Sequence, residues 1–130
     1  MYRMDVDRQH AVIDLVLDGL IRQEEMVRLG EELKSIIRKF SGRSIKLKTD
    51  MRTLRASSPE VAEMFGAVQR YAVEHGVKRM AELVTSPLLL LQLNRVERDS
   101  GAAKIVRRFG DDQTALRWLL QQDDRAALAV

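Results

Sequence analysis

Short apolar segments alternate with longer amphipathic segments along most of the chain, and this alternation constrains the fold more than any other feature. Strand-length apolar runs predict β-strands, whereas apolar residues recurring every three or four positions predict helices. The predicted strands are 2–6, 11–17, 44–51, 77–85 and 104–109. The predicted helices are 23–40, 59–75, 86–99 and one that is capped by Asp111 or Asp112 and fades into Asp123 to Val130. This order implies an α/β fold with a mainly parallel sheet of about five strands, right-handed crossovers and about four helices.

The polar turn Asp7-Arg8-Gln9 joins the first two predicted strands, so the first strand is expected at an antiparallel edge of the sheet. The second strand is apolar enough to be buried on both faces. At 130 residues, the chain is long enough for one hydrophobic core but not for two, and we expect residues 1–130 to form a single domain. Gly30, inside the first helix, predicts a close approach of this helix to the sheet.

The composition excludes several classes of protein. The chain has no cysteine, which rules out disulfides, thiolate nucleophiles and cysteine-bound zinc, and it fits a cytoplasmic protein. The charged N-terminus lacks the apolar core of a signal peptide, and the longest apolar run, Leu88 to Leu91, is too short to span a membrane.

No pattern of residues indicates catalysis. The seven glycines do not form a phosphate loop, and no Gly-x-Ser-x-Gly nucleophile elbow is present. His10 and His75 lack the spacing of a metal site and are expected to be exposed. Glu82 lies within a predicted inner strand, where a carboxylate needs a partner, and Lys48 is one candidate. We therefore expect a structural role for Glu82, no cofactor, no metal and no enzymatic activity.

Basic residues gather between Arg38 and Arg55, where the local charge is +6 while the remainder of the chain sums to −3. Such a segment could contact phosphates or an acidic protein surface. Aromatic residues make up only 5% of the chain, so the stacking side chains typical of single-strand binding are missing. A solvated face or an acidic protein partner is therefore favoured over nucleic acid.

The segment Leu47 to Glu60 combines a strand ending in Asp50-Met51, a short loop, and the helix start Ser57-Ser58-Pro59. It resembles the central segment of STAS domains, the family of bacterial anti-sigma-factor antagonists and of the cytoplasmic tails of sulfate transporters. The opening hairpin and the segment Leu17 to Ile21 are also similar to that family. The resemblance implies a regulatory module that binds another protein, such as a kinase or an anti-sigma-type regulator.

In members that switch partners, a kinase phosphorylates a serine within Asp-Ser-Ser-Gly at the helix start, and Ser57 and Ser58 are the matching positions. This chain differs in having Ala56 before the serines, Pro59 after them and a shorter loop. From the residues alone, Ser58 is expected to cap the helix, with proline at the first helical position and Glu60 beside the positive end of the dipole. Two interpretations of these serines therefore remain: phosphorylation by a kinase, or a helix cap at Ser58 that is not modified.

The sequence thus predicts a non-enzymatic, STAS-like interaction module. It does not determine whether the chain also forms homo-oligomers. The expected partner surface runs from the end of the third strand into the next helix and comprises Asp50, Arg52, Thr53, Arg55, Glu60, Glu63 and Met64. An alternative is a nucleotide or lipid sensor, because open parallel sheets bind ligands at the carboxyl ends of their strands. That alternative predicts a pocket near Asp50, Thr53, Thr85 and Ser86.

Overall fold

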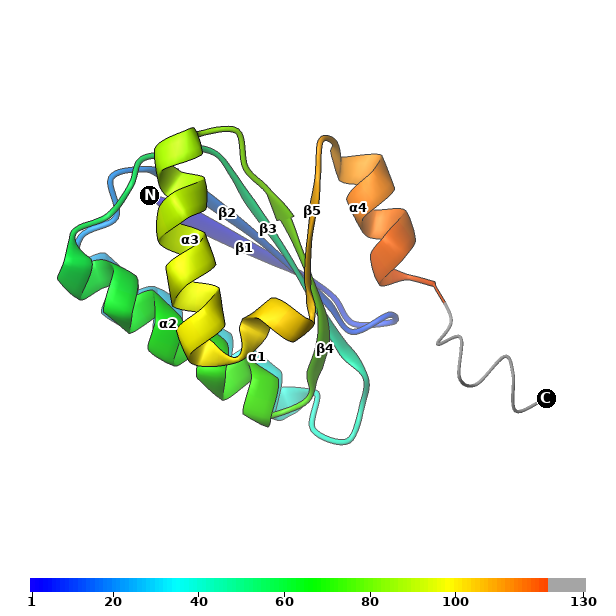
Figure 1. Cartoon of the computed structure of the whole chain (residues 1–130). Helices are drawn as coiled ribbons and strands as arrows, with labels where there is room; N and C mark the ends of the chain where they lie inside the picture. Colours follow the sequence, from blue (N-terminus) through cyan, green and yellow to red (C-terminus); the bar gives the residue numbers. More distant parts are fainter. Residues whose placement is uncertain (122–130) are drawn as a thin grey trace.

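A computed structural model describes residues 1–121, which form one mixed five-stranded sheet with helices on both faces (Figure 1). The strands are β1 (Tyr2–Asp7), β2 (Val12–Gly19), β3 (Ile45–Leu54), β4 (Val77–Leu83) and β5 (Val106–Phe109). The helices are α1 (Gln23–Lys39), α2 (Pro59–Glu74), α3 (Pro87–Ser100), a short 3-10 helix (Ala102–Lys104) and α4 (Asp112–Leu119). The predicted order of elements is confirmed, while the expected continuation of the last helix into Asp123 to Val130 lies outside the described residues.

The strands are arranged in the order β1-β2-β3-β4-β5. β1 pairs antiparallel with β2, and every other pair is parallel, as predicted from the opening hairpin. The hairpin turn is held by the Asp7 carboxylate, which accepts hydrogen bonds from the backbone N–H groups of Gln9 and His10. An aspartate that binds the backbone two and three residues ahead is a common way to stabilise such a turn.

Helices α1, α2 and α3 cover one face of the sheet, and α4 covers part of the other (Figure 1). The main core lies under the three helices and includes Ile13, Leu15, Leu17, Leu29, Leu33, Ile37 and Ile45. A smaller core under α4 contains Val12, Ala81, Ala115 and Leu119. Because α4 packs on β3, β4 and β5, Asp14 and Val16 of β2 are only half-buried. The expectation that β2 is buried on both faces is therefore wrong for these two residues.

Several local features also differ from the predictions, among them β4, which ends at Leu83 rather than Thr85, and Lys104, which lies in the 3-10 helix rather than in the last strand. β3 continues three residues beyond Met51, because β2 resumes pairing after a register shift and brings Asp18 and Gly19 opposite Thr53 and Leu54. A Cβ on Gly30 would lie 3.0 Å from Val68 of α2, so the close approach at this glycine joins two helices rather than a helix and the sheet.

Candidate functional site

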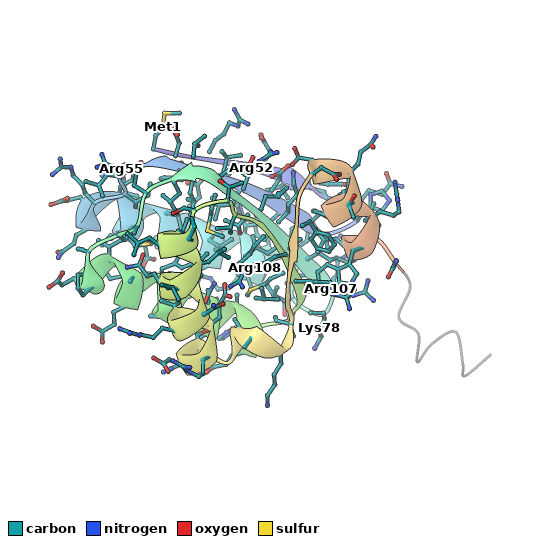
Figure 2. All side chains as sticks on the ribbon, turned by 45° about the horizontal axis from the view of Figure 1, so that its top comes forward. Met1, Arg52, Arg55, Lys78, Arg107 and Arg108 are labelled. Carbon is teal, nitrogen blue, oxygen red and sulfur yellow. The ribbon has the colours of Figure 1, made fainter. Side chains whose placement is uncertain are left out.

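The carboxyl end of β3 carries a compact charge network. Asp50 accepts three hydrogen bonds from Arg52: one from the backbone N–H at 3.1 Å and two from the guanidinium at 3.0 and 2.7 Å. These bonds hold the pKa of the Asp50 carboxyl below its usual value. The guanidinium also donates to Asp112 of α4 at 3.0 Å, and Figure 2 shows Arg52 near the end of β3. Asp50 and Arg52, both predicted as partner residues, are therefore bonded to each other, and much of their charge is satisfied within the molecule.

The loop after β3 is fixed by a contact with α3. The side-chain amide of Gln92 accepts a hydrogen bond from the Ser57 N–H at 2.9 Å and donates one to the Ser57 carbonyl at 2.8 Å. Both backbone groups of Ser57 are thus engaged, and its residue surface is half-buried. At the other end of the loop, the Arg55 N–H donates to the carbonyl of Gly19 at 2.9 Å. The loop therefore has one defined path into α2.

Ser58 is the N-cap of α2, which confirms the capping prediction. Its hydroxyl oxygen accepts a hydrogen bond from the Val61 N–H at 3.3 Å, and Pro59 occupies the first helical position. Ser58 is exposed, so its hydroxyl is accessible while it caps the helix. Of the two candidate serines, Ser58 is the more exposed.

Replacing the cap should have a measurable effect on stability. We expect Ser58→Ala to lower the free energy of unfolding by about 1 kcal/mol, because the Val61 N–H loses its acceptor. Ser58→Asp should stay within about 0.5 kcal/mol of the wild type, since aspartate is an equally good N-cap. Urea denaturation of the three proteins at neutral pH measures both effects, and equal loss in the two variants would contradict the capping role.

The other predicted partner residues lie along the same edge and onto α2. Arg52, Thr53, Arg55, Glu60 and Glu63 are exposed, whereas Met64 is half-buried and packs against the main core. No ion pair within residues 1–121 involves Arg55. Figure 2 shows Arg55 at the outer side of the loop. Arg55 is therefore a positive charge of the predicted surface that no ion pair of residues 1–121 neutralises.

The basic segment from Arg38 to Arg55 is largely used inside the molecule. Lys48 lies between two carboxylates, with its Nζ 3.2 Å from Asp14 and 2.5 Å from Asp112. These neighbours raise the pKa of the Lys48 amine, although its burial opposes them. Arg43 donates to the backbone carbonyls of Arg8 and Gln9 at 2.6 and 2.7 Å. Internal contacts of this kind explain the local excess of basic residues.

The partner predicted for Glu82 is wrong, and the sheet register explains why. Glu82 pairs in the sheet with Thr49 on one side and Arg108 on the other, whereas Lys48 pairs with Ala81. Because side chains alternate along a strand, Lys48 and Glu82 point to opposite faces of the sheet. The Glu82 carboxylate accepts a hydrogen bond from Arg108 Nε at 3.3 Å.

Around this pair lies a polar cluster, which comprises the buried residues Gln69, Glu82, Glu97 and Ser100 and the partly exposed side chain of Arg108. Arg108 Nη2 also donates to Glu97 at 2.8 Å, and Gln69 donates to the same carboxylate at 3.3 Å. The Ser100 hydroxyl donates to the side-chain carbonyl of Gln69 at 3.2 Å. Burial between the sheet and the helices, together with the nearby Glu97, raises the pKa of Glu82 well above its usual value. The cluster fits the structural role expected for Glu82.

Two of the residues that the small-ligand alternative places at a pocket, Thr85 and Ser86, make internal contacts at the strand ends. The Thr85 hydroxyl donates to the Arg52 carbonyl at 3.4 Å, and Ser86 accepts a hydrogen bond from the Leu89 N–H as the cap of α3. A groove of about 850 Å³ lies between α2 and α3.

His10 and His75 are exposed, as expected. In the described part of the chain, no group of three or more His, Asp or Glu residues could hold a metal ion, and no helix is long and apolar enough to cross a membrane.

Comparison with known proteins found no matching family model and no matching curated protein. Several solved structures match over nearly the full length. A DUF3478-family protein with a SpoIIAA-like fold from Shewanella loihica PV-4 is 18% identical, with a TM-score of 0.69, over 91% of this chain and 93% of that one. The Bacillus cell-fate determinant SpoIIAA in its phosphorylated form is 15% identical, with a TM-score of 0.63, over 92% and 99%.

An anti-sigma factor antagonist from Mycobacterium paratuberculosis is 14% identical, with a TM-score of 0.58, over 93% of this chain and 96% of that one. Similarity at such low identity shows a shared fold. The five-stranded mixed sheet and the four α-helices of residues 1–121 match that fold. The chain therefore has the SpoIIAA-like fold of STAS domains and anti-sigma factor antagonists.

Proposed function

We propose that this chain is a non-enzymatic, cytoplasmic regulatory module that binds another protein, of the anti-sigma or kinase type, through the edge that leads from β3 into α2. The proposed surface consists of Asp50, Arg52, Thr53, Arg55, Glu60, Glu63 and Met64. Binding is switched by phosphorylation at the start of α2. Of the two candidates, Ser57 and Ser58, we favour Ser58, because it is exposed whereas Gln92 holds both backbone groups of Ser57.

The observation that carries this proposal is an exposed cap serine at the start of α2 in a fold that SpoIIAA, solved in a phosphorylated form, also has. A phosphate on Ser58 would meet the positive end of the α2 dipole and the free N–H groups of its first turn. It would also add negative charge next to Arg55 and Glu60. The same helix start can therefore accommodate the modification without unfolding and change the charge that a partner meets.

Arg55 is a better position than Arg52 for a charge reversal that tests partner binding. Reversing the charge of Arg52 would break its bonds to Asp50 and Asp112, so a loss of binding could follow from a local rearrangement. Reversing Arg55 breaks no ion pair of residues 1–121, which makes it the cleaner probe. Ser58→Asp introduces negative charge while keeping a capping side chain.

We expect Ser58→Asp and Arg55→Glu each to weaken partner binding by at least about tenfold, or about 1.4 kcal/mol. Affinity purification from an extract of the native cell, followed by mass spectrometry, identifies a partner. Titration calorimetry with that purified partner then compares the variants with Arg117→Glu, a charge reversal at an exposed position of α4. Equal affinities for the wild type, Ser58→Asp and Arg55→Glu would refute the proposed surface.

A further inference from the structure

β1 is an edge strand whose outer side has no backbone partner within residues 1–121. It lies at one end of the sheet and pairs only with β2. Edge strands present unpaired N–H and C=O groups to which another strand can bind, and natural proteins often block them with proline, lysine or a bulge. The segment Tyr2–Asp7 contains neither proline nor lysine, and its pairing with β2 is regular. In the described part of the chain, this edge is therefore open to a further strand.

The first pair of the hairpin shows which backbone groups of β1 face outward. Met1 and Asp18 exchange two hydrogen bonds of 2.8 Å, one from the Met1 ammonium to the Asp18 carbonyl and one from the Asp18 N–H to the Met1 carbonyl. In an antiparallel ladder, such doubly bonded pairs recur at every second residue. The intervening residues Tyr2, Met4 and Val6 therefore direct their N–H and C=O groups away from β2.

Two opposite charges lie on either side of the centre of this edge. The side chains of Arg3 and Asp5 share one face of the strand, are 70% and 74% exposed, and lie 3.6 Å apart. An ion pair this exposed contributes little to stability, and both groups remain accessible to a further charge. Met4, between them, points to the other face and packs against the main core. Opposite charges placed symmetrically about Met4 complement themselves in a strand that runs the other way.

We infer that β1 pairs antiparallel with β1 of a second copy of this chain, about a twofold axis at Met4, so that the two sheets become continuous. The two Met4 residues then exchange two backbone hydrogen bonds, and Tyr2 of each copy pairs with Val6 of the other. Arg3 of each copy lies opposite Asp5 of the other. Because this pair is one without hydrogen bonds, its side chains are close enough to form an ion pair.

The charges also select this register over its neighbours. A twofold axis at Arg3 would place the two Arg3 side chains opposite each other, and an axis at Asp5 would do the same with the two Asp5 side chains. Like charges that lie directly opposite in a sheet are destabilising. Because both copies use the same edge, the assembly closes as a dimer. The inference goes beyond the proposed function, since β1 shares no residue with the proposed partner surface.

Sedimentation equilibrium and light scattering on the full chain, from micromolar to submillimolar concentration, test the inference. We expect a dimer for the wild type. Met4→Pro should give a monomer, because proline lacks the N–H group that faces the second copy, while the N–H groups that pair with β2 stay in place. Lys78→Glu, a charge reversal at an exposed position of β4, should leave the dimer unchanged.

A mixing experiment tests the register. Arg3→Asp and Asp5→Arg should each weaken dimerisation by at least about tenfold, because each variant brings like charges opposite one another. An equimolar mixture of the two variants should form heterodimers about as stable as the wild-type dimer, since every charge at position 3 again meets an opposite charge at position 5. Neither variant retains an ion pair within its own strand, so this recovery can only come from contacts between chains.

Circular dichroism verifies that each variant is folded before its mass is interpreted. A wild type that stays monomeric throughout the concentration range would overturn the inference. A folded Met4→Pro variant that still dimerises would place the interface elsewhere and overturn it, and so would a mixture that dimerises no better than its separate components. None of these measurements involves the partner or the phosphorylation of the proposed function.

Discussion

Replacing Arg108 with methionine is expected to lower the free energy of unfolding by about 3–5 kcal/mol, because it leaves the buried Glu97 without its cation and the buried Glu82 carboxyl without its hydrogen-bond donor. Glu82 is 2% exposed and Glu97 3% exposed, and both accept hydrogen bonds from this one guanidinium. Arg108 itself comes from β5, a four-residue edge strand. The guanidinium thus ties the end of the sheet to α3, and its loss removes both the charge balance and this connection.

Arg107 provides a matched control on the same strand. Figure 2 shows Arg108 pointing toward α3 and Arg107 toward α4, where Arg107 lies over the Trp118 ring at 5.3 Å. An exposed cation–π contact of this kind contributes about 0.5–1 kcal/mol, so Arg107→Met should cost no more than that. Urea denaturation of both variants at neutral pH gives the comparison. The account of the buried cluster is wrong if the two substitutions cost the same.

The order of strands and helices was predictable because its signals are local. Apolar periodicity defines each element, and the Ser58-Pro59 and Ser86-Pro87 pairs mark two helix starts that the structure confirms. The end of β3 was not predictable in the same way. β3 extends to Leu54 because it pairs with β2 beyond a register shift between Val16 and Asp18. No residue pattern within β3 predicts that shift.

The partners of charged side chains depend on sheet register, which local patterns do not determine. Thr49, Glu82 and Arg108 form one row across the sheet, while Lys48 and Ala81 belong to the next row and face the other way. An error of one residue in register therefore assigned Glu82 to the wrong cation. One available signal was Glu97, which follows Leu89 and Leu93 at helical spacing and so lies on the buried stripe of α3.

The candidate site was predictable to the same extent. The cap formed by Ser58 depends on three neighbouring residues and was found from the sequence, whereas the bonds between Asp50 and Arg52 were not predicted. Gln92 and Asp112 were missed, because each reaches the site from a helix distant in sequence. Gln92 fixes the path of the loop and Asp112 balances the charge of Arg52, and the three-dimensional structure is needed to identify both.

The buried cluster also predicts how stability depends on pH. Burial raises the pKa of Glu82 well above its usual value of 4.5, and the hydrogen bond to Glu97 raises it further. In the unfolded chain Glu82 loses its proton near its usual pKa, whereas the folded protein retains the proton to higher pH. Within that window the folded state binds more protons, so the free energy of unfolding falls as pH rises.

The Asp50 and Asp112 carboxyls act in the opposite direction and in a different window. Their pKa values are lowered, chiefly by hydrogen bonds from Arg52 and Lys48 respectively, so the stability they contribute is lost only as pH falls below the usual range of aspartate. Stability should therefore decline on both sides of a maximum. The alkaline side reports on Glu82, and the acidic side reports on the charge network at the end of β3.

Glu82→Gln should remove most of the decline on the alkaline side. A glutamine amide donates to Glu97 as the protonated acid does, yet its hydrogens do not dissociate, and its oxygen still accepts from Arg108. Above the usual pKa of glutamate, and until the folded protein releases the Glu82 proton, the slopes of unfolding free energy against pH should differ between the two proteins by as much as one proton, or about 1.4 kcal/mol per pH unit. Glu60→Gln, at an exposed position of α2, should keep the wild-type slope. Urea denaturation at a series of pH values measures the slopes, and parallel curves for the wild type and Glu82→Gln would show that Glu82 is ionised in the folded protein.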